Sequence, residues 1–278
     1  MTQSSTLWKT SRLLLAICVT LVMFFPVYWM LVTSLKTPAE LRLAVPTFWP
    51  ESMKWSNYAE VFTSFPFARF ALNTFIQTVG IVFLQINIAI MAAYAFAKGN
   101  FAFREQWFLL VLAALIVPDQ VTFVPVYVMM SKLGWINTFW ALIVPHAASA
   151  YGIFLLRQTF KSINNDVIEA ARVDGASRFQ VLYRILTPMA LPTIATLTVL
   201  SFISSWNSYF WPLVMTNSNN MRVLTVGIAM MKDSMAGDEA LTFHLIMAAS
   251  VVVILPIVII FVFAQKYIIA AMSNSTFK

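Results

Sequence analysis

A small polar stretch interrupts this apolar chain: "IEAARVDGAS", residues 168–177. It places charged side chains beside very small ones, at Glu169, Ala170, Ala171, Arg172, Asp174 and Gly175. By helical spacing, Glu169 and Arg172 share one face, and Val167, Ile168 and Ala171 share another. The paired alanines put almost no side chain between the backbone and a neighbouring molecule. This pattern predicts docking into a groove of another protein, with Glu169 available for an ionic contact.

Short-range signals predict that this stretch folds as a helix, a tight turn and a second helix. Asn164 or Asn165 is a suitable N-cap for the first helix, and Gly175 suits the left-handed position that closes a helix. Ser177 opens a capping-box pattern for the second helix, which we expect Pro188 to end. The alternative is an amphipathic helix on the membrane surface, but the stretch carries acids where anionic lipid prefers bases.

Polar side chains inside the apolar runs are candidates for a solute path. Asp119 is one, because a carboxylate within a membrane is costly and usually faces a cavity or a partner. Its alternatives are a helix–helix hydrogen bond or a protonated acid. Asn207 stands between Trp206 and Tyr209; amides with aromatic rings suit sugars, although such rings also form the interfacial belt. His146 has no second ligand at metal spacing, so we expect a packed hydrogen-bonding group and no metal site.

The composition indicates that helices in a lipid bilayer must position these residues. Of 278 residues, 60% are hydrophobic and 10% are charged, and the mean hydropathy is +0.79, so lipid is the expected solvent. The net charge of +7 does not indicate nucleic-acid binding, because the basic residues lie between apolar runs rather than on one surface. The single cysteine, Cys18, excludes an intramolecular disulfide.

Six apolar stretches are long enough to cross a bilayer, which takes about 20 residues each. They are residues 13–35, 71–97, 107–130, 138–156, 189–214 and 243–265. The first is longer than the apolar core of a signal peptide, so we expect a retained anchor helix. Prolines in the third and fifth stretches, Pro118, Pro125 and Pro192, predict kinks. The predicted fold class is an all-α integral membrane protein with six transmembrane helices.

The distribution of basic residues predicts the orientation. The N-terminus, the second and fourth loops and the C-terminus together carry 11 Lys and Arg residues, and the other loops carry 7. Loops rich in Lys and Arg stay in the cytoplasm. We therefore expect both termini, and the polar stretch between the fourth and fifth spans, on the cytoplasmic side.

The polar stretch resembles the EAA loop of permease subunits of bacterial ABC importers. The matching residues are Glu169, Ala170, Ala171, Gly175, Ile185 and Pro188. "EAARVDGAS", "ALIVPHAASAYGIFLLRQTFKSI" and "SFISSWNSYFWPL" are similar to the carbohydrate branch, which includes the second maltose permease and the glycerol-3-phosphate permeases. The resemblance covers most of residues 70–265. Thr187, where leucine is usual, and the ending "AAMSNSTFK", without the common glycines, depart from the pattern.

The resemblance implies a type I ABC importer permease fold with cytoplasmic termini, in a bacterial cytoplasmic (inner) membrane. Residues 1–70 are then the anchor helix and first periplasmic loop, and residues 71–267 are the transmembrane core. The coupling loop is at about residues 161–188, and residues 268–278 form a cytoplasmic tail. The implied partners are a second homologous permease, two ABC ATPase subunits, an extracytoplasmic solute-binding protein and the lipid bilayer, with no nucleic acid.

The resemblance also assigns roles in the coupling loop. Glu169 would supply an ionic contact to the ATPase, Ala170 and Ala171 the close approach, and Gly175 the turn. Asp174 would support the turn or pair locally. ATP and Mg would be bound by the ATPase subunits, since this chain has no G-x-x-x-x-G-K-[ST] phosphate loop. The chain itself is expected to need no cofactor and to be no enzyme.

Other functions remain open on the sequence. A glycerol-3-phosphate-type permease is one, although the spans offer no Lys or Arg for a phosphate. A proton-coupled secondary transporter using Asp119 and His146 is another, but it leaves the EAA-like stretch unexplained. A membrane enzyme acting on lipid would need paired metal-binding carboxylates near one interface, and the carboxylates cluster only on the polar stretch.

Overall fold

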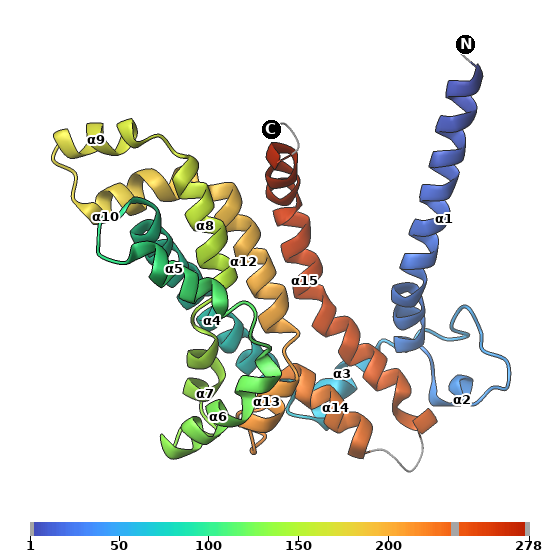
Figure 1. The fold of residues 1–278 in the computed structure, drawn as a ribbon. Coiled ribbons are helices and arrows are strands. Elements are labelled where there is room, and N and C mark those ends of the chain that lie inside the picture. Colours follow the sequence, from blue (N-terminus) through green and yellow to red (C-terminus); the bar gives the residue numbers. More distant parts are fainter. Residues whose placement is uncertain (1–2, 235–238, 276–278) are drawn as a thin grey trace. The chain divides into compact units, whose positions relative to one another are not determined.

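The computed structural model describes residues 3–234 and 239–275, and Figure 1 shows them as a ribbon. Within these ranges all regular structure is helical and no strand occurs, which confirms the all-α prediction. The helices are α1 Gln3–Ser34, α2 Pro38–Leu41, α3 Ser56–Ser64, α4 Phe67–Lys98, α5 Arg104–Ala113, α6 Asp119–Lys132, α7 Phe139–Ile143, η1 Val144–His146, α8 Ala150–Ser162, α9 Asn165–Val173, α10 Arg178–Gln180, η2 Val181–Leu186, α11 Thr187–Met189, α12 Leu191–Trp206, α13 Phe210–Met215, α14 Leu224–Ser234 and α15 Glu239–Ser275.

Three helical segments of the described chain are long and apolar enough to cross a membrane. They are Trp8–Ser34, Phe67–Lys98 and Thr242–Gln265, in agreement with the first, second and sixth predicted spans. Two bent pairs bring the total to as many as five: Phe139–His146 with Ala150–Ser162, at 42°, and Arg178–Met189 with Leu191–Trp206, at 83°. Over residues 13–25 of α1 the apolar side chains are exposed, with Val22 at 73% and Met23 at 76%, as expected where lipid is the solvent.

The third predicted span, residues 107–130, is wrong as a continuous helix. The structure has α5 and α6 there, separated by an irregular segment at residues 114–118. Pro118 disfavours helical geometry in the residue before it and then serves as the N-cap of α6. Asp119 therefore begins a helix instead of lying in the middle of one. Pro125, inside α6, does not interrupt that helix.

The fifth predicted span, residues 189–214, also differs from the structure. Pro192 lies in the first turn of α12, which ends before Asn207, and the sharp bend is at Ala190. The preceding helical segment runs through Pro188 and ends at Met189, one residue beyond the expected stop. The chain widens into a π-helix at Val181–Leu186, and this wider turn accommodates the proline.

The chain folds into two compact units, which we describe separately. Unit 1 comprises Met1–Phe67 and Gly227–Pro256, and unit 2 comprises Ala68–Val226 and Ile257–Lys278. The core of unit 2 joins α4, α8, α9, η2 and α12 through buried side chains such as Ala89, Phe160, Ile168, Leu186 and Leu197. Both candidate sites lie in unit 2. The predicted tail at residues 268–278 continues α15 as far as Ser275, and residues 276–278 lie outside the described chain.

Candidate functional site: a helix–turn–helix segment and a polar cavity

The EAA-like stretch folds as helix, turn and helix (Figure 1). The Asn164 side chain caps α9 by accepting a hydrogen bond from the Asp166 amide at 3.2 Å. At the other end, Gly175 has φ +80°, and the Ala176 amide donates to the Ala171 carbonyl at 2.9 Å. This bond belongs to a Schellman motif, which satisfies carbonyls at the end of a helix.

The second helical segment begins with the predicted capping box. The Ser177 hydroxyl accepts from the Gln180 amide at 3.3 Å, and the Gln180 side chain accepts from the Ser177 amide at 2.7 Å. The segment then continues through η2 to α11, where the Thr187 hydroxyl donates to the Leu182 carbonyl at 2.8 Å. Thr187, the departure from the family pattern, thus contributes a hydrogen bond to the π-helical turn that a leucine would lack.

The two faces of α9 have different environments. Ile168 and Ala171 are 3% and 9% exposed and belong to the core of unit 2. Glu169, Ala170 and Arg172 are exposed, as are Asp174 and Gly175 in the turn. The predicted separation of an apolar and a charged face is therefore confirmed. Ala171 packs inward with Ile168, and Ala170 is the alanine of the pair that lies on the exposed face.

Two exposed apolar side chains of this segment escaped the sequence reasoning. Val173 is 88% exposed at the end of α9, and Phe179 is 69% exposed at the start of the second helix. Two features of the sequence could have indicated this exposure. Val173 directly follows Arg172 of the charged face, and Phe179 lies between two polar residues in the first turn of its helix. With Ala170 they give the exposed surface of the segment an apolar component beside Glu169.

A lysine from α4 holds the base of the segment. The Lys98 ammonium donates to the Ile163 carbonyl at 2.7 Å and to the Asn165 side-chain oxygen at 2.6 Å. These acceptors flank the N-cap of α9. The start of α9 is therefore tied to the end of α4 by bonds to a charged donor, which are stronger than neutral ones.

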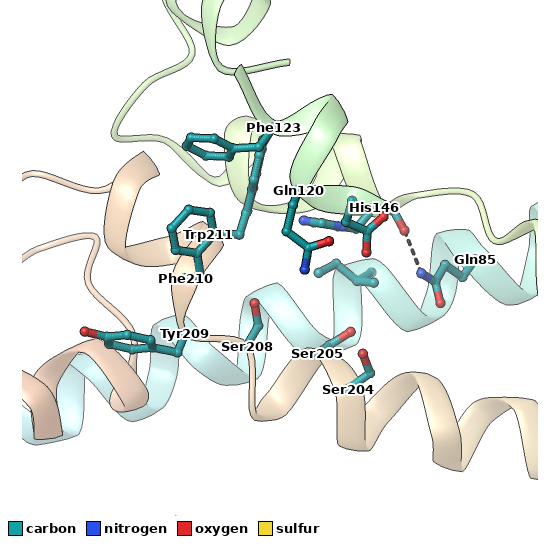
Figure 2. Close-up of a pocket in the computed structure, with 12 residues that line it drawn as sticks. Gln85, Gln120, Phe123, His146, Ser204, Ser205, Ser208, Tyr209, Phe210 and Trp211 are labelled. Atoms are coloured by element: carbon teal, nitrogen blue, oxygen red, sulfur yellow. Dashed lines mark hydrogen bonds between the residues drawn. The ribbon is translucent and has the colours of Figure 1, made fainter. Parts of the chain in front are cut away.

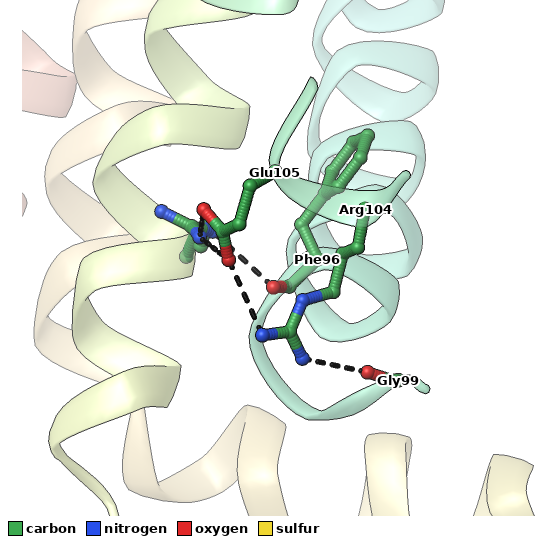
Figure 3. Close-up of polar contacts among 5 residues, drawn as sticks. Phe96, Gly99, Arg104 and Glu105 are labelled. Atoms are coloured by element: carbon green, nitrogen blue, oxygen red, sulfur yellow. Dashed lines mark hydrogen bonds and ion pairs between the residues drawn. The ribbon is translucent and has the colours of Figure 1, made fainter. Parts of the chain in front are cut away.

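An ion pair between a buried arginine and a half-exposed glutamate holds α8, the helix that leads into the segment (Figure 3). Arg157 is 4% exposed, and its guanidinium binds both carboxylate oxygens of Glu105 on α5 at 2.7 and 2.8 Å. The same guanidinium donates to the Phe96 carbonyl at 3.2 Å and lies 3.8 Å from the ring centre of Phe108. Arg104 also donates to Glu105, at 3.2 Å.

Glu105 is held in its charged form by these neighbours. Partial desolvation would raise the pKa of its carboxyl, but the hydrogen bonds and the charge of Arg157, with the charge of Lys161, lower that pKa below its ordinary value. Sequence reasoning used Arg157 only to predict orientation. It missed the ion pair because the partners are 52 residues apart.

The second site is a cavity of about 360 Å³ between α4, α6, η1 and the end of α12 (Figure 2). Gln85, Asp119, Gln120 and His146 line one part of its wall. The Gln85 amide donates to the His146 carbonyl at 2.8 Å. The Nε2 atom of His146 is buried and has no hydrogen-bond partner, so this ring presents an unused polar atom beside the cavity.

The opposite wall combines hydroxyls with aromatic rings. Figure 2 shows Ser204, Ser205, Ser208 and Tyr209 following one another along this wall. The aromatic part is a packed cluster: the Phe123 ring centre is 4.8 Å from that of Phe210 and 5.8 Å from that of Trp211. None of the described lining residues is a lysine or an arginine.

Two of the four residues predicted for the solute path lie at this cavity. Asp119 and Tyr209 line it. Trp206 is 5% exposed and stacks on Phe202 at 5.4 Å, and the side-chain amide of Asn207 donates to the carbonyl of Ile203 in the preceding helix α12. Neither is a lining residue. Within the described ranges no cluster of His, Cys, Asp or Glu is arranged to hold a metal ion.

These features define a class: a multi-pass membrane protein with a solute-sized polar cavity and a surface segment suited to docking. The chain belongs to the family described as the inner membrane component of binding-protein-dependent transport systems, which it matches over residues 85–274. It is therefore a permease subunit of the inner membrane, as the EAA-like stretch predicted.

Relatives and a solved structure support this assignment along nearly the whole chain. The arabinooligosaccharide transport permease of Halalkalibacterium halodurans is 31% identical, over 90% of this chain and 89% of the relative. The sn-glycerol-3-phosphate transport permease of Pectobacterium atrosepticum is 29% identical, over 92% of each. A bacterial ABC transporter that imports the acidic polysaccharide alginate contains a similar chain, with TM-score 0.86 and 25% identity over 96% of this chain and 98% of that one.

Proposed function

We propose that this chain is one of two permease subunits of an ATP-driven importer for a sugar or a related polyol. It would cross the inner membrane six times with both termini in the cytoplasm. Its partners would be a second homologous permease, two ABC ATPase subunits and an extracytoplasmic binding protein. The family membership and the named solutes of the relatives support this proposal. ATP and Mg bind to the ATPase subunits, and this chain makes and breaks no covalent bond.

The segment from α9 to α11 is the coupling element of this proposal. The observation that carries it is the division of α9 into an inward face that joins the core and an outward face with Glu169, Ala170 and Arg172. A partner that grips the outward face moves the inward face, and with it the helices of the unit 2 core. Glu169 supplies the ionic contact to the ATPase, and Ala170 allows the close approach of its surface. Gly175 forms the turn, which needs a residue in the left-handed conformation.

Charge reversal at Glu169 tests the coupling role. We expect Glu169→Lys to abolish ATP-driven uptake and to weaken co-purification of the ATPase, while the chain still inserts into the membrane. Gly175→Pro should act similarly, because proline cannot adopt the observed φ of +80°. The matched control is Glu51→Lys, the same change at an exposed carboxylate outside unit 2. Normal uptake and normal ATPase recovery with Glu169→Lys would refute the assignment.

The cavity favours an uncharged, polyhydroxylated solute. Serine hydroxyls, glutamine amides and the Asp119 carboxylate offer donors and acceptors for sugar hydroxyls, and the Phe123–Phe210–Trp211 cluster lies beside them as an apolar surface. A phosphate or carboxylate solute would need a cation, because anions are bound most strongly by arginine and lysine. The described lining residues include none, so a glycerol-3-phosphate-type permease is the less favoured alternative.

A proton-driven transporter is the other alternative. The observation in its favour is that two ionisable side chains, Asp119 and His146, line the same cavity. Uptake by this chain alone in proteoliposomes, driven by a pH gradient without ATP, would support it. Family membership does not favour this alternative.

A further inference from the structure

A loop in unit 1 displays large apolar side chains that the coupling and transport roles do not use. Residues 42–55, which we call the aromatic loop, follow α2 and lead to α3. Its large apolar side chains are exposed, namely Leu43, Val45, Phe48, Trp49, Met53 and Trp55. Val45 is 77% and Trp49 61% exposed. Single exposed apolar residues are ordinary, but a group this dense marks a surface that contacts lipid or another molecule.

The aromatic loop is tied to the end of α1 by side chains of that helix and its C-terminal flank. The Tyr28 hydroxyl donates to the Phe48 carbonyl at 2.5 Å, and the Trp29 ring meets the Phe48 ring edge-on at 6.0 Å. Lys36, only 2% exposed, donates its ammonium to the Thr47 carbonyl and lies 4.7 Å from the Trp29 ring centre. The tip of the loop therefore lies beside the last turns of α1.

The second half of the loop is fixed in the same way. The Glu40 carboxylate accepts from the amide of Glu51, and the Lys54 amide donates to the Leu35 carbonyl at 2.9 Å. Glu40 also accepts from the Thr37 amide at 2.7 Å. Polar groups of the loop backbone are thus used for tethers, and the apolar side chains are left on the outside.

The length of α1 places these contacts at the edge of the bilayer. The apolar segment Trp8–Ser34 has 27 residues, which span about 40 Å at 1.5 Å per residue, whereas the hydrocarbon core is about 30 Å thick. A centred helix then extends about 5 Å beyond the core at each end. Tyr28 precedes Ser34 by six residues, or about 9 Å. It therefore lies just inside the hydrocarbon boundary, and Phe48 lies at its level.

We propose that the aromatic loop is an interfacial anchor whose apolar side chains insert into the lipid leaflet at the C-terminal end of α1. Trp, Tyr and Phe side chains favour this depth. Basic residues flank the loop, Arg42 at its start and Lys54 near its end, and long basic side chains of this kind place their charge at the headgroup level while their stems contact lipid. The loop continues the lipid-exposed surface of α1, whose side chains around Val22 and Met23 face outward. This inference does not depend on the solute or on the coupling role.

The anchor fixes the height of α1 in the membrane. A helix longer than the hydrocarbon core is free to slide or tilt. The loop is tethered by hydrogen bonds to Tyr28 of α1, to Leu35 and Lys36 directly after it and to Glu40 of α2. Insertion of this tethered loop at one depth limits that motion. The loop thus holds unit 1 at one depth in the bilayer.

Spin labels on the loop test the proposal. Cys18 is the only cysteine, so Cys18→Ala gives a background for Val45→Cys and Trp49→Cys, two exposed positions for which we find no tethering contact. The control is Glu51→Cys, where an exposed carboxylate must face water. The labelled chain, with its co-purified subunits in lipid nanodiscs, is then probed by power-saturation EPR with oxygen, which enters lipid, and a nickel chelate, which stays in water.

We expect oxygen accessibility to exceed nickel accessibility several-fold at residues 45 and 49, and the ratio to invert at residue 51. High nickel accessibility at residues 45 and 49 would overturn the proposal, because the loop would face water. Low accessibility to both reagents would also overturn it, since a protein partner rather than lipid would then cover the loop. Retained ATP-driven uptake by each labelled chain verifies that the loop is folded.

Discussion

At the scale of residues, the half-exposed carboxylate of Glu105 neutralises the buried guanidinium of Arg157 in unit 2. Arg157 is almost fully buried, and only Glu105 supplies it with a carboxylate in the described chain. Removing the Glu105 carboxylate leaves the buried Arg157 charge uncompensated, which is destabilising. The backbone carbonyl of Phe96 and the ring of Phe108 remain as weaker contacts. The stability of the α5–α8 contact therefore depends on the charge of Glu105.

We expect Glu105→Gln to lower the Tm of the purified complex by a few degrees at neutral pH. The pKa of Glu105 is lowered in the fold, so its contribution is complete above the ordinary value of 4.5 and is lost as pH falls through the lowered pKa. The difference in Tm between wild type and variant should accordingly shrink in acid. Glu51→Gln, at an exposed acid without an ion pair, is the control. A difference independent of pH would contradict this account.

Residue-scale features were predictable where they are local. The Asn164 cap, the left-handed Gly175 and the capping box at Ser177 each depend on residues within one turn, and the structure confirms all three. The Arg157–Glu105 pair depends on how two distant helices pack, and no spacing in the sequence indicates it. Helical spacing also places Ala171 on the same face as Ile168, and both side chains are buried in the core of unit 2.

At the scale of elements, prolines were the main source of error. A proline in an apolar run predicts a kink within one helix. Pro118 instead separates α5 from α6, Pro192 lies in the first turn of α12, and Pro188 is absorbed by a π-helical turn. The effect of a proline depends on whether neighbouring groups satisfy the freed backbone atoms, and those neighbours come from the tertiary structure. The three uninterrupted spans, by contrast, followed directly from apolar length.

The tether between α4 and α9 gives an element-scale prediction. Lys98→Met removes the bonds to the Ile163 carbonyl and the Asn165 side chain. Because α9 is a short helix, losing the fixation of its first turn should speed amide hydrogen exchange in residues 163–173 by roughly tenfold, if about 1.4 kcal/mol is lost. Exchange within the buried part of α4 should not change. Hydrogen exchange read by mass spectrometry measures both.

Lys161→Met is the matched control for this experiment, since Lys161 is an exposed lysine on α8 close to the same segment. Its loss should leave exchange in residues 163–173 as in wild type. Equal acceleration by both substitutions would mean that general loss of positive charge, rather than the tether, is responsible.

At the scale of the whole molecule, the two candidate sites share one core. α12 contributes Ser204 and Ser205 to the cavity and Leu197 to the same buried cluster that contains Ile168 and Ala171 of α9. Packed side chains transmit displacement because interiors are close to crystal density. A movement of α9 therefore has a continuous path to the wall of the cavity. Composition and motifs predicted the two functions of this unit, but only the fold shows that α12 connects them.

Substitution at Asp119 tests whether the cavity selects its solute by charge. Asp119→Asn removes the only carboxylate among the described lining residues. If that carboxylate accepts hydrogen bonds from solute hydroxyls, its loss should raise the KM for the solute retained by the co-purifying binding protein by roughly tenfold, since a bond to a charged group contributes about 1.5–3 kcal/mol. It should also make sn-glycerol-3-phosphate a better competitor. Asn207→Ala is the control, because the side-chain amide of Asn207 bonds to the preceding helix α12 and should leave both quantities unchanged. An unaltered KM and an unaltered preference in Asp119→Asn would place solute selection outside this cavity, in the second permease or the binding protein.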